Sequence, residues 1–193
     1  MPVEHVRTEG RAGRMGHHLM SVVAAGDRRR IYRPPSELHR LAARVERPPD
    51  VPDGALGDDP RAITPPNYGL GHFADIFTDR QLLTLTTLSD LVLEVRARAL
   101  RDAIACGLPP GARLDDGGTG AEAYADAVAT YLSLAIGKHA DYGNSLVAWY
   151  PQEGRPSHLF TLATISMGWD FCEVNPWSDV GGAWSRSVTI VAN

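Results

Sequence analysis

Two long runs of apolar residues at helical spacing, separated by a segment rich in glycine and proline, constrain the fold of this chain most. The first run covers residues 79–105, and the second ends near Tyr142. Residues three or four apart lie on one face of a helix. We therefore predict two helices that form an antiparallel pair and bury these faces against each other. The recurring residues are Leu85, Leu88, Val92, Val95 and Ala99, then Tyr124, Val128, Tyr131, Ala135 and His139.

The residues that flank these helices predict where they begin and end. Asp79 has the chemistry of an N-cap, and Cys106-Gly107 followed by Pro109-Pro110 predicts the end of the first helix. The turn DDGGTGAEAY could offer backbone amides to a phosphate. It contains neither of the two glycine-rich phosphate motifs, and no strand precedes it. We favour a plain turn between helices, with Thr119 near the N-cap of the second one.

The remaining segments carry weaker signals. GRMGHHLMSVVAAG has apolar residues at helical spacing, RRRIYRPP is expected to be extended, and Ser36 is a candidate N-cap for a short helix. NSLVAWY, SHLFTLATISMGWDF and SVTIVAN are β-prone or ambiguous, and we expect a few strands near residues 145–171. Six prolines over residues 48–71 predict a linker. The expected segments are therefore 1–47, 48–71 and 72–193.

Length and charge limit the function classes. The 193 residues suit one domain, or one domain with an appendage, and the net charge of −4 repels nucleic acid overall. No apolar run is long enough to cross a membrane, so we expect no membrane partner and a soluble, cytoplasmic protein. Neither the two cysteines nor the seven histidines show metal-like spacing. We predict no metal site, inert cysteines, and surface positions for His17 and His18 on a helix.

One basic cluster departs from the acidic balance. Four arginines, Arg28, Arg29, Arg30 and Arg33, fall within seven residues around Tyr32. Guanidinium groups contact phosphates and an aromatic ring stacks on bases, so the pattern is typical of a nucleic-acid contact. A solvated surface without a ligand is the alternative.

The segment EVNPWSD resembles the Asn/Asp-Pro-Pro-aromatic tetrad of enzymes that methylate an exocyclic amine of a DNA base. That tetrad accepts hydrogen bonds from the target amine while its aromatic residue stacks on the flipped base. Here Trp177 takes the place of the second proline and Ser178 that of the aromatic residue. We favour a plain Asn-Pro turn and predict no catalytic residue.

Four stretches together resemble the middle of the large bacterial adenine-specific DNA methylases that carry an N-terminal domain of unknown function and, often, a zinc ribbon. They follow the family's order and span about residues 4–185. The stretches are EGRAGRMGHHLMSVVA, YGLGHFADIFTDRQLLTLTTLSDLV, GGTGAEAYADAVATYLSLAIGKHADY and WDFCEVNPWSDVGGAW.

The resemblance implies an α/β protein: a helix-dominated fragment of a Rossmann-like S-adenosylmethionine-dependent methyltransferase, with few strands in its C-terminal part. EVNPWSD corresponds to an Asn-Pro-Phe-Ser segment that precedes the family's catalytic Asp-Pro-Pro-Tyr. FADIFTDRQL is similar to a Phe-Thr-Pro-Arg-Gln stretch that helps hold S-adenosylmethionine, which implies cofactor contacts for Phe77, Thr78 and Gln81. Asp79 replaces the usual proline, and helix capping by Thr78 or Asp79 is the alternative.

Neither the family's cofactor loop, Asp-Pro-Phe-x-Gly-x-Gly, nor its Asp-Pro-Pro-Tyr occurs in these 193 residues. We therefore expect a truncated or split part of an adenine-specific DNA methyltransferase that is inactive alone. Its partners would be DNA and chains that carry the missing parts. The alternative is a non-catalytic module that binds DNA or another protein.

Overall fold

The computed structural model describes residues 2–193, which divide into two compact units that do not follow chain order. The first unit comprises Met1–Leu83 and Asn144–Glu173, and the second comprises Thr84–Gly143 and Val174–Asn193. Each unit is described by itself below. The predicted segments 1–47, 48–71 and 72–193 remain a prediction.

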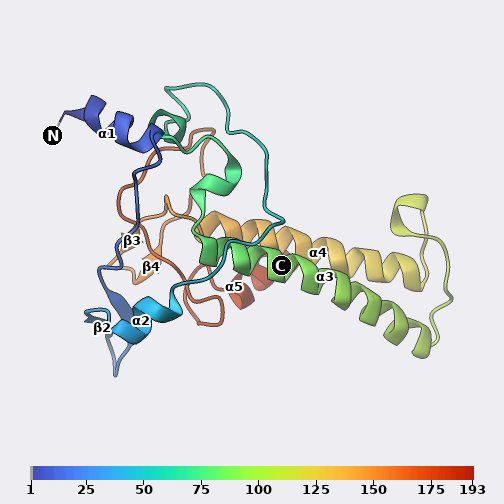
Figure 1. Ribbon diagram of the computed structural model, residues 1–193. Helices are drawn as coiled ribbons and strands as arrows, with labels where there is room; N and C mark the ends of the chain where they lie inside the picture. The colour runs from blue at the N-terminus through green and yellow to red at the C-terminus, as the bar shows by residue number, and fades with distance from the viewer. Residues whose placement is uncertain (1) are drawn as a thin grey trace. The chain divides into compact units, whose positions relative to one another are not determined.

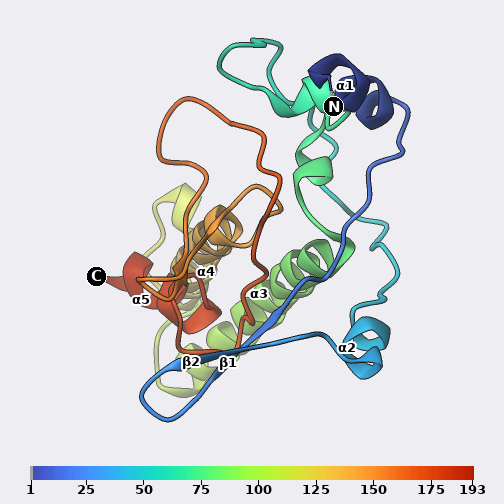
Figure 2. The ribbon, with the colours of Figure 1, turned by 90° about the vertical axis from the view of Figure 1, so that its left-hand side faces the viewer.

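The first unit is built from short elements. Helix α1 lies beside the 3-10 helix η1, as both ribbon views show (Figures 1 and 2). Two antiparallel pairs of strands, β1 with β2 and β3 with β4, form its two small sheets. The elements are α1 (Val3–Arg11), β1 (Val22–Ala25), β2 (Arg30–Arg33), α2 (Glu37–Ala42), η1 (Pro65–Tyr68), η2 (Phe73–Ile76), β3 (Trp149–Tyr150) and β4 (Arg155–Pro156).

Chain segments that are far apart in sequence form the core of the first unit. Ile76 and Val147 are almost fully buried. Ser145 joins them, because its backbone N–H and its hydroxyl both donate to the Ile76 carbonyl, at 2.8 and 2.9 Å. The segment that follows the second long helix is thereby attached to Ile76, three residues before the first long helix begins at Asp79.

The second unit is a helical hairpin with a third helix. Helix α3 (Asp79–Ala105) begins in the first unit and continues into the second, which also holds η3 (Leu114–Asp116), α4 (Ala121–Tyr142) and α5 (Trp184–Ala192). Helices α3 and α4 run antiparallel (Figure 1), which confirms the predicted pair. Helix α5 packs on α4 and buries Ser187.

The buried faces of the two long helices differ in part from the predicted stripes. Leu88 and Val92 of α3 and Ala135 and His139 of α4 are buried, as expected. The other six of the ten residues are not buried: Leu85, Ala99 and Val128 are half-buried, and Val95, Tyr124 and Tyr131 are exposed. On α4 the buried face is lined by small alanines, so the tyrosines point outward.

Local boundaries follow the capping rules. Ser36 caps α2 as predicted, with its hydroxyl accepting from the His39 backbone. Gly107, at φ 93°, ends α3 in a left-handed conformation that glycine adopts without strain. The predicted N-cap of α3, Asp79, is wrong by one residue, because Thr78 forms the cap. The N-cap of α4 is Gly120, next to Thr119, which was expected near it.

One prediction of secondary structure is wrong, and one segment whose sequence was β-prone or ambiguous is helical. Residues 13–26 form no helix; α1 lies earlier, and Val22–Ala25 pairs with Arg30–Arg33 as a strand. His17 and His18 are therefore not helical, although both are exposed. SVTIVAN is not β-structure but the body of α5, where packing on α4 overrides its β-branched composition.

The observed fold class is helix-rich α/β with two small antiparallel sheets. The strands β3 and β4 fall within the range 145–171 where strands were expected. Among the helices that the structure describes, none combines the length and hydropathy that a membrane span needs.

Candidate functional site

The predicted arginines lie on the hairpin of β1 and β2 in the first unit. Arg28 and Arg29 occupy its tip, where Arg28 adopts φ 60° and the Gly26 N–H donates to the Arg29 carbonyl at 2.9 Å. Arg30 begins β2, and Arg33 ends it. Side chains alternate along a strand, so Arg30 and Tyr32 share one face and Arg33 lies on the other.

The β3–β4 hairpin supplies partners for that shared face. The Arg30 guanidinium carbon lies 5.4 Å from the centre of the Trp149 ring, which is within cation–π range. The Trp149 indole N–H donates to the Tyr32 hydroxyl at 2.9 Å. A Cβ at Gly154, which has φ 63°, would collide with the Arg30 guanidinium. Arg30 is thus packed between an indole ring and a bare backbone.

This cluster of Arg28, Arg29, Arg30, Tyr32 and Trp149 is called the arginine–tyrosine face below. In the described part of the chain, none of its three arginines forms an ion pair with a carboxylate within 4.0 Å. Arg28 and Arg29 are exposed, and Tyr32 is 49% exposed. The face is therefore cationic and open to an anionic ligand that also offers a flat ring.

The sequence alone did not indicate Trp149 and Gly154 as members of this face. Trp149 lies 117 residues from its hydrogen-bond partner Tyr32, so no local spacing connects them. Its place in a β-prone run was the only available signal. The contact arises because the two hairpins pack within one unit.

Phe77, Thr78 and Gln81, the residues predicted for cofactor contact, come together at the start of α3. They form a reciprocal capping box: the Thr78 N–H donates to Gln81 Oε1 at 2.8 Å, and the Gln81 N–H donates to Thr78 Oγ1 at 3.3 Å. Phe77 is buried beside them. The capping alternative is therefore confirmed for Thr78, while Asp79 instead pairs with Arg47 at 3.2 Å.

One polar group of this cap has no partner in the described structure. Gln81 is 8% exposed, and its Nε2 is buried without a hydrogen-bond acceptor. A buried donor without an acceptor is costly and calls for a ligand or a water molecule. The carboxylate of S-adenosylmethionine is an acceptor of the right kind. Gln81 Nε2 could make that one contact. The cap already uses the other polar side-chain atoms of these residues, Gln81 Oε1 and Thr78 Oγ1.

The first turn of α3 also connects two of the four stretches named above, YGLGHFADIFTDRQLLTLTTLSDLV and WDFCEVNPWSDVGGAW. Arg80 binds Glu173 with two nitrogens, one of them at 2.7 Å, and donates to the Ala43 carbonyl at 2.6 Å. The hydrogen bonds that Arg80 donates to Glu173 raise the pKa of Arg80. Arg80 thus fixes the residue at which EVNPWSD begins.

The Asn-Pro segment itself forms a turn in the second unit. The Trp177 N–H donates to Asn175 Oδ1 at 3.0 Å, and the Ser178 hydroxyl donates to the Asn175 carbonyl at 2.7 Å. The acceptors that a methylase would aim at a target amine are thereby used inside the turn, and Trp177 is 74% exposed. The predicted plain turn is confirmed.

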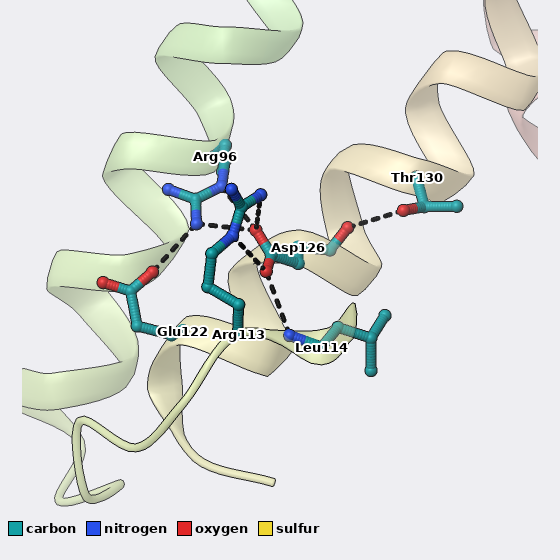
Figure 3. Close-up of polar contacts among 6 residues, drawn as sticks. All are labelled: Arg96, Arg113, Leu114, Glu122, Asp126 and Thr130. Atoms are coloured by element: carbon teal, nitrogen blue, oxygen red, sulfur yellow. Dashed lines mark hydrogen bonds and ion pairs between the residues drawn. The ribbon is translucent and has the colours of Figure 1, made fainter. Parts of the chain in front are cut away.

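A buried carboxylate network joins the helices of the second unit (Figure 3). Asp126 accepts from Arg113 Nε at 3.2 Å, from the Leu114 N–H at 3.1 Å and from Arg96 Nε at 2.7 Å. Arg96 also donates to Glu122 at 2.8 Å. These hydrogen bonds, those of Arg113 first, hold the pKa of Asp126 well below its ordinary value of 3.8.

This network is structural, because every atom of the Asp126 carboxylate already faces donors from the chain. It holds α3, α4 and the connection between them together. The sequence analysis did not identify it. The available signal was the pair of acidic residues Glu122 and Asp126, four positions apart and so on one face of the predicted second helix.

Two further titratable groups are buried or half-buried. His139 Nδ1 lies 2.7 Å from the Gly182 carbonyl, and burial lowers the pKa of this imidazole. Burial also raises the pKa of the Cys172 thiol to about 11. Among the described residues, no three His, Cys, Asp or Glu side chains gather as a metal ion would require. A shallow apolar hollow of about 280 Å³ is lined by Val3, Val6, Tyr68 and Trp169, none of which was a predicted site residue.

Comparisons with known proteins give no match: no family model, no curated protein and no solved structure matches this chain.

Proposed function

We propose that this chain is a DNA-contacting, non-catalytic part of an adenine-specific DNA methyltransferase. The proposal joins two independent arguments. The arginine–tyrosine face supports DNA contact, and the sequence resemblance over about residues 4–185 supports the methyltransferase.

The observation that carries the proposal is the arrangement of Arg28, Arg29 and Arg30 on one hairpin, with no carboxylate partner among residues 2–193. Surface arginines commonly pair with nearby acids, as Arg14 does with Glu9 at 2.6 Å. A cluster left without such pairs, on a chain of net charge −4, creates a local positive potential in an otherwise repulsive field. Phosphate groups are the ligands that such a cluster favours.

The methyltransferase part of the proposal assigns the first turn of α3 to the cofactor's neighbourhood. The Gln81 Nε2 donor, buried without an acceptor, is compatible with a carboxylate there. S-adenosylmethionine would supply the methyl group once a complete enzyme is assembled. On this proposal, the Rossmann-like sheet and the cofactor loop come from other parts of that enzyme.

DNA retention with charge-matched variants tests the proposal. In a filter or mobility assay at low salt, wild type should retain DNA, and R28Q/R29Q should lose most of it. The matched control, R98Q/R101Q, removes the same charge from exposed positions on α3 and should bind as wild type does. Equal loss in both variants would show that only net charge matters and would overturn the proposal.

The non-catalytic part has its own test. Labelled methyl groups from S-adenosylmethionine should not enter DNA above background with this chain alone. Incorporation above background, lost on substituting Gln81, would show that these residues form a complete site.

A second candidate, a subunit that needs a protein partner, is favoured by exposed apolar side chains on α4. Tyr124, Tyr131 and Leu134 are 53%, 57% and 58% exposed. Such side chains within one helix are typical of a surface that another chain covers. Methylase activity that co-purifies with the chain from its host would support this candidate, and a monodisperse monomer in light scattering would count against it.

A further inference from the structure

The arginine–tyrosine face carries more than positive charge, because it holds a half-exposed aromatic ring in a fixed position. The Tyr32 hydroxyl accepts the Trp149 indole N–H at 2.9 Å, and the indole in turn packs against Arg30. The backbone of Gly154 lies against the other side of Arg30. Tyr32 is thus held at its hydroxyl while 49% of the residue stays exposed.

We infer that Tyr32 is a stacking platform for an unpaired base, so that this face binds single-stranded DNA in preference to duplex DNA. The inference rests on the proposed DNA contact and names the form of DNA that it takes. In a duplex the flat faces of the bases are stacked on one another, and only their edges and the phosphates are accessible. An exposed, fixed ring on the same hairpin as the exposed Arg28 and Arg29 offers the two kinds of contact that a single strand needs.

The geometry also separates this platform from the other exposed aromatic residue nearby. Tyr150 follows Trp149 directly in β3, so its side chain points to the opposite face of the strand. Tyr150 is 44% exposed and packs with Arg155, whose guanidinium carbon lies 5.6 Å from its ring centre. Arg155 is already paired with Glu153. Tyr150 is therefore a matched control, with similar exposure but without unpaired arginines.

Fluorescence anisotropy with a labelled oligothymidine strand and a labelled duplex of equal length tests the inference. Wild type should bind the single strand more tightly. Tyr32→Leu should weaken single-strand binding by about 5- to 100-fold, the range measured for the loss of one base–aromatic stack, and should leave duplex binding unchanged. Tyr32→Phe keeps the ring but loses the hydrogen bond from Trp149, so it should retain most of the preference for the single strand, and Tyr150→Leu should behave as wild type.

Three outcomes would overturn the inference. These are equal or tighter binding of the duplex, equal weakening of both forms by Tyr32→Leu, or an effect of Tyr150→Leu as large as that of Tyr32→Leu. Failure of the proposed function gives a different result, since wild type would then bind neither form in a way that depends on Arg28 and Arg29.

Discussion

At the scale of single residues, the chain uses its charges in two different ways. In the second unit, Arg96 and Arg113 both form ion pairs with the carboxylate of Asp126 (Figure 3). In the first unit, neither Arg28 nor Arg29 forms an ion pair with a carboxylate among the residues that the structure describes. A paired guanidinium stabilises the fold, whereas an unpaired one is available for a ligand.

Removing the charge of Asp126 should destabilise the second unit. Asp126→Asn leaves two arginines facing a neutral amide, so the melting temperature should fall by several degrees. Asp102→Asn, which alters an exposed i, i+4 pair with Arg98, is the control and should change it little. An unchanged melting temperature in Asp126→Asn would mean that the network does not hold the helices together.

The same residue predicts how stability depends on pH. Because the pKa of Asp126 is lowered in the fold, the folded chain binds fewer protons than the unfolded chain near pH 4. Its stabilisation should be fully present above the ordinary value of 3.8 and lost as the pH falls towards the lowered pKa. The difference in melting temperature between wild type and Asp126→Asn should therefore shrink in acid.

The two cysteines should differ in reactivity. Cys106 is exposed, whereas the thiol of Cys172 is partly buried, with a pKa raised to about 11. Since the thiolate is the reactive form, a disulfide reagent at pH 8 should label one thiol in the native chain and two after denaturation. Cys106→Ser should abolish native labelling, and rapid native labelling of that variant would contradict the burial of Cys172.

At the scale of elements, helix ends were more predictable from the sequence than pairing partners. Ser36 and Gly107 end or begin helices by local chemistry, so their roles follow from a few neighbouring residues. Residues 13–26 have helical spacing, yet Val22–Ala25 pairs with the strand that follows it. SVTIVAN is β-branched, yet it is helical where it packs on α4. Pairing with the next strand decided the first case, and packing on the remote helix α4 decided the second; the spacing within each segment shows neither partner.

The capping box of α3 gives a prediction at this scale. Thr78→Ala removes the acceptor for the Gln81 N–H, so the free energy of unfolding should fall by about 1 kcal/mol, the typical loss for an N-cap. Thr78→Ser keeps a hydroxyl and should cost much less. Urea unfolding followed by circular dichroism measures both, and equal effects of the two substitutions would mean that the hydroxyl is not the cap.

At the scale of the whole molecule, the sequence predicted the helix-rich class and the antiparallel pair α3–α4. A long run of apolar residues at helical spacing predicts a helix without information from the rest of the chain. It could not predict the two interleaved units, whose boundaries depend on contacts between remote segments. The candidate site divides in the same way. Arg28, Arg29 and Arg30 were evident as a local cluster, but Trp149 joined them only through the packing of two hairpins.

The salt dependence of DNA binding tests the central claim most directly. Each neutralised phosphate of a single strand contributes a slope of about −0.7 to log K against log salt, so three guanidinium groups predict about −2. R28Q/R29Q leaves only Arg30, so its slope should be about −0.7. R98Q/R101Q should have the same slope as wild type. The same slope in wild type and R28Q/R29Q would contradict the claim that this hairpin contacts DNA.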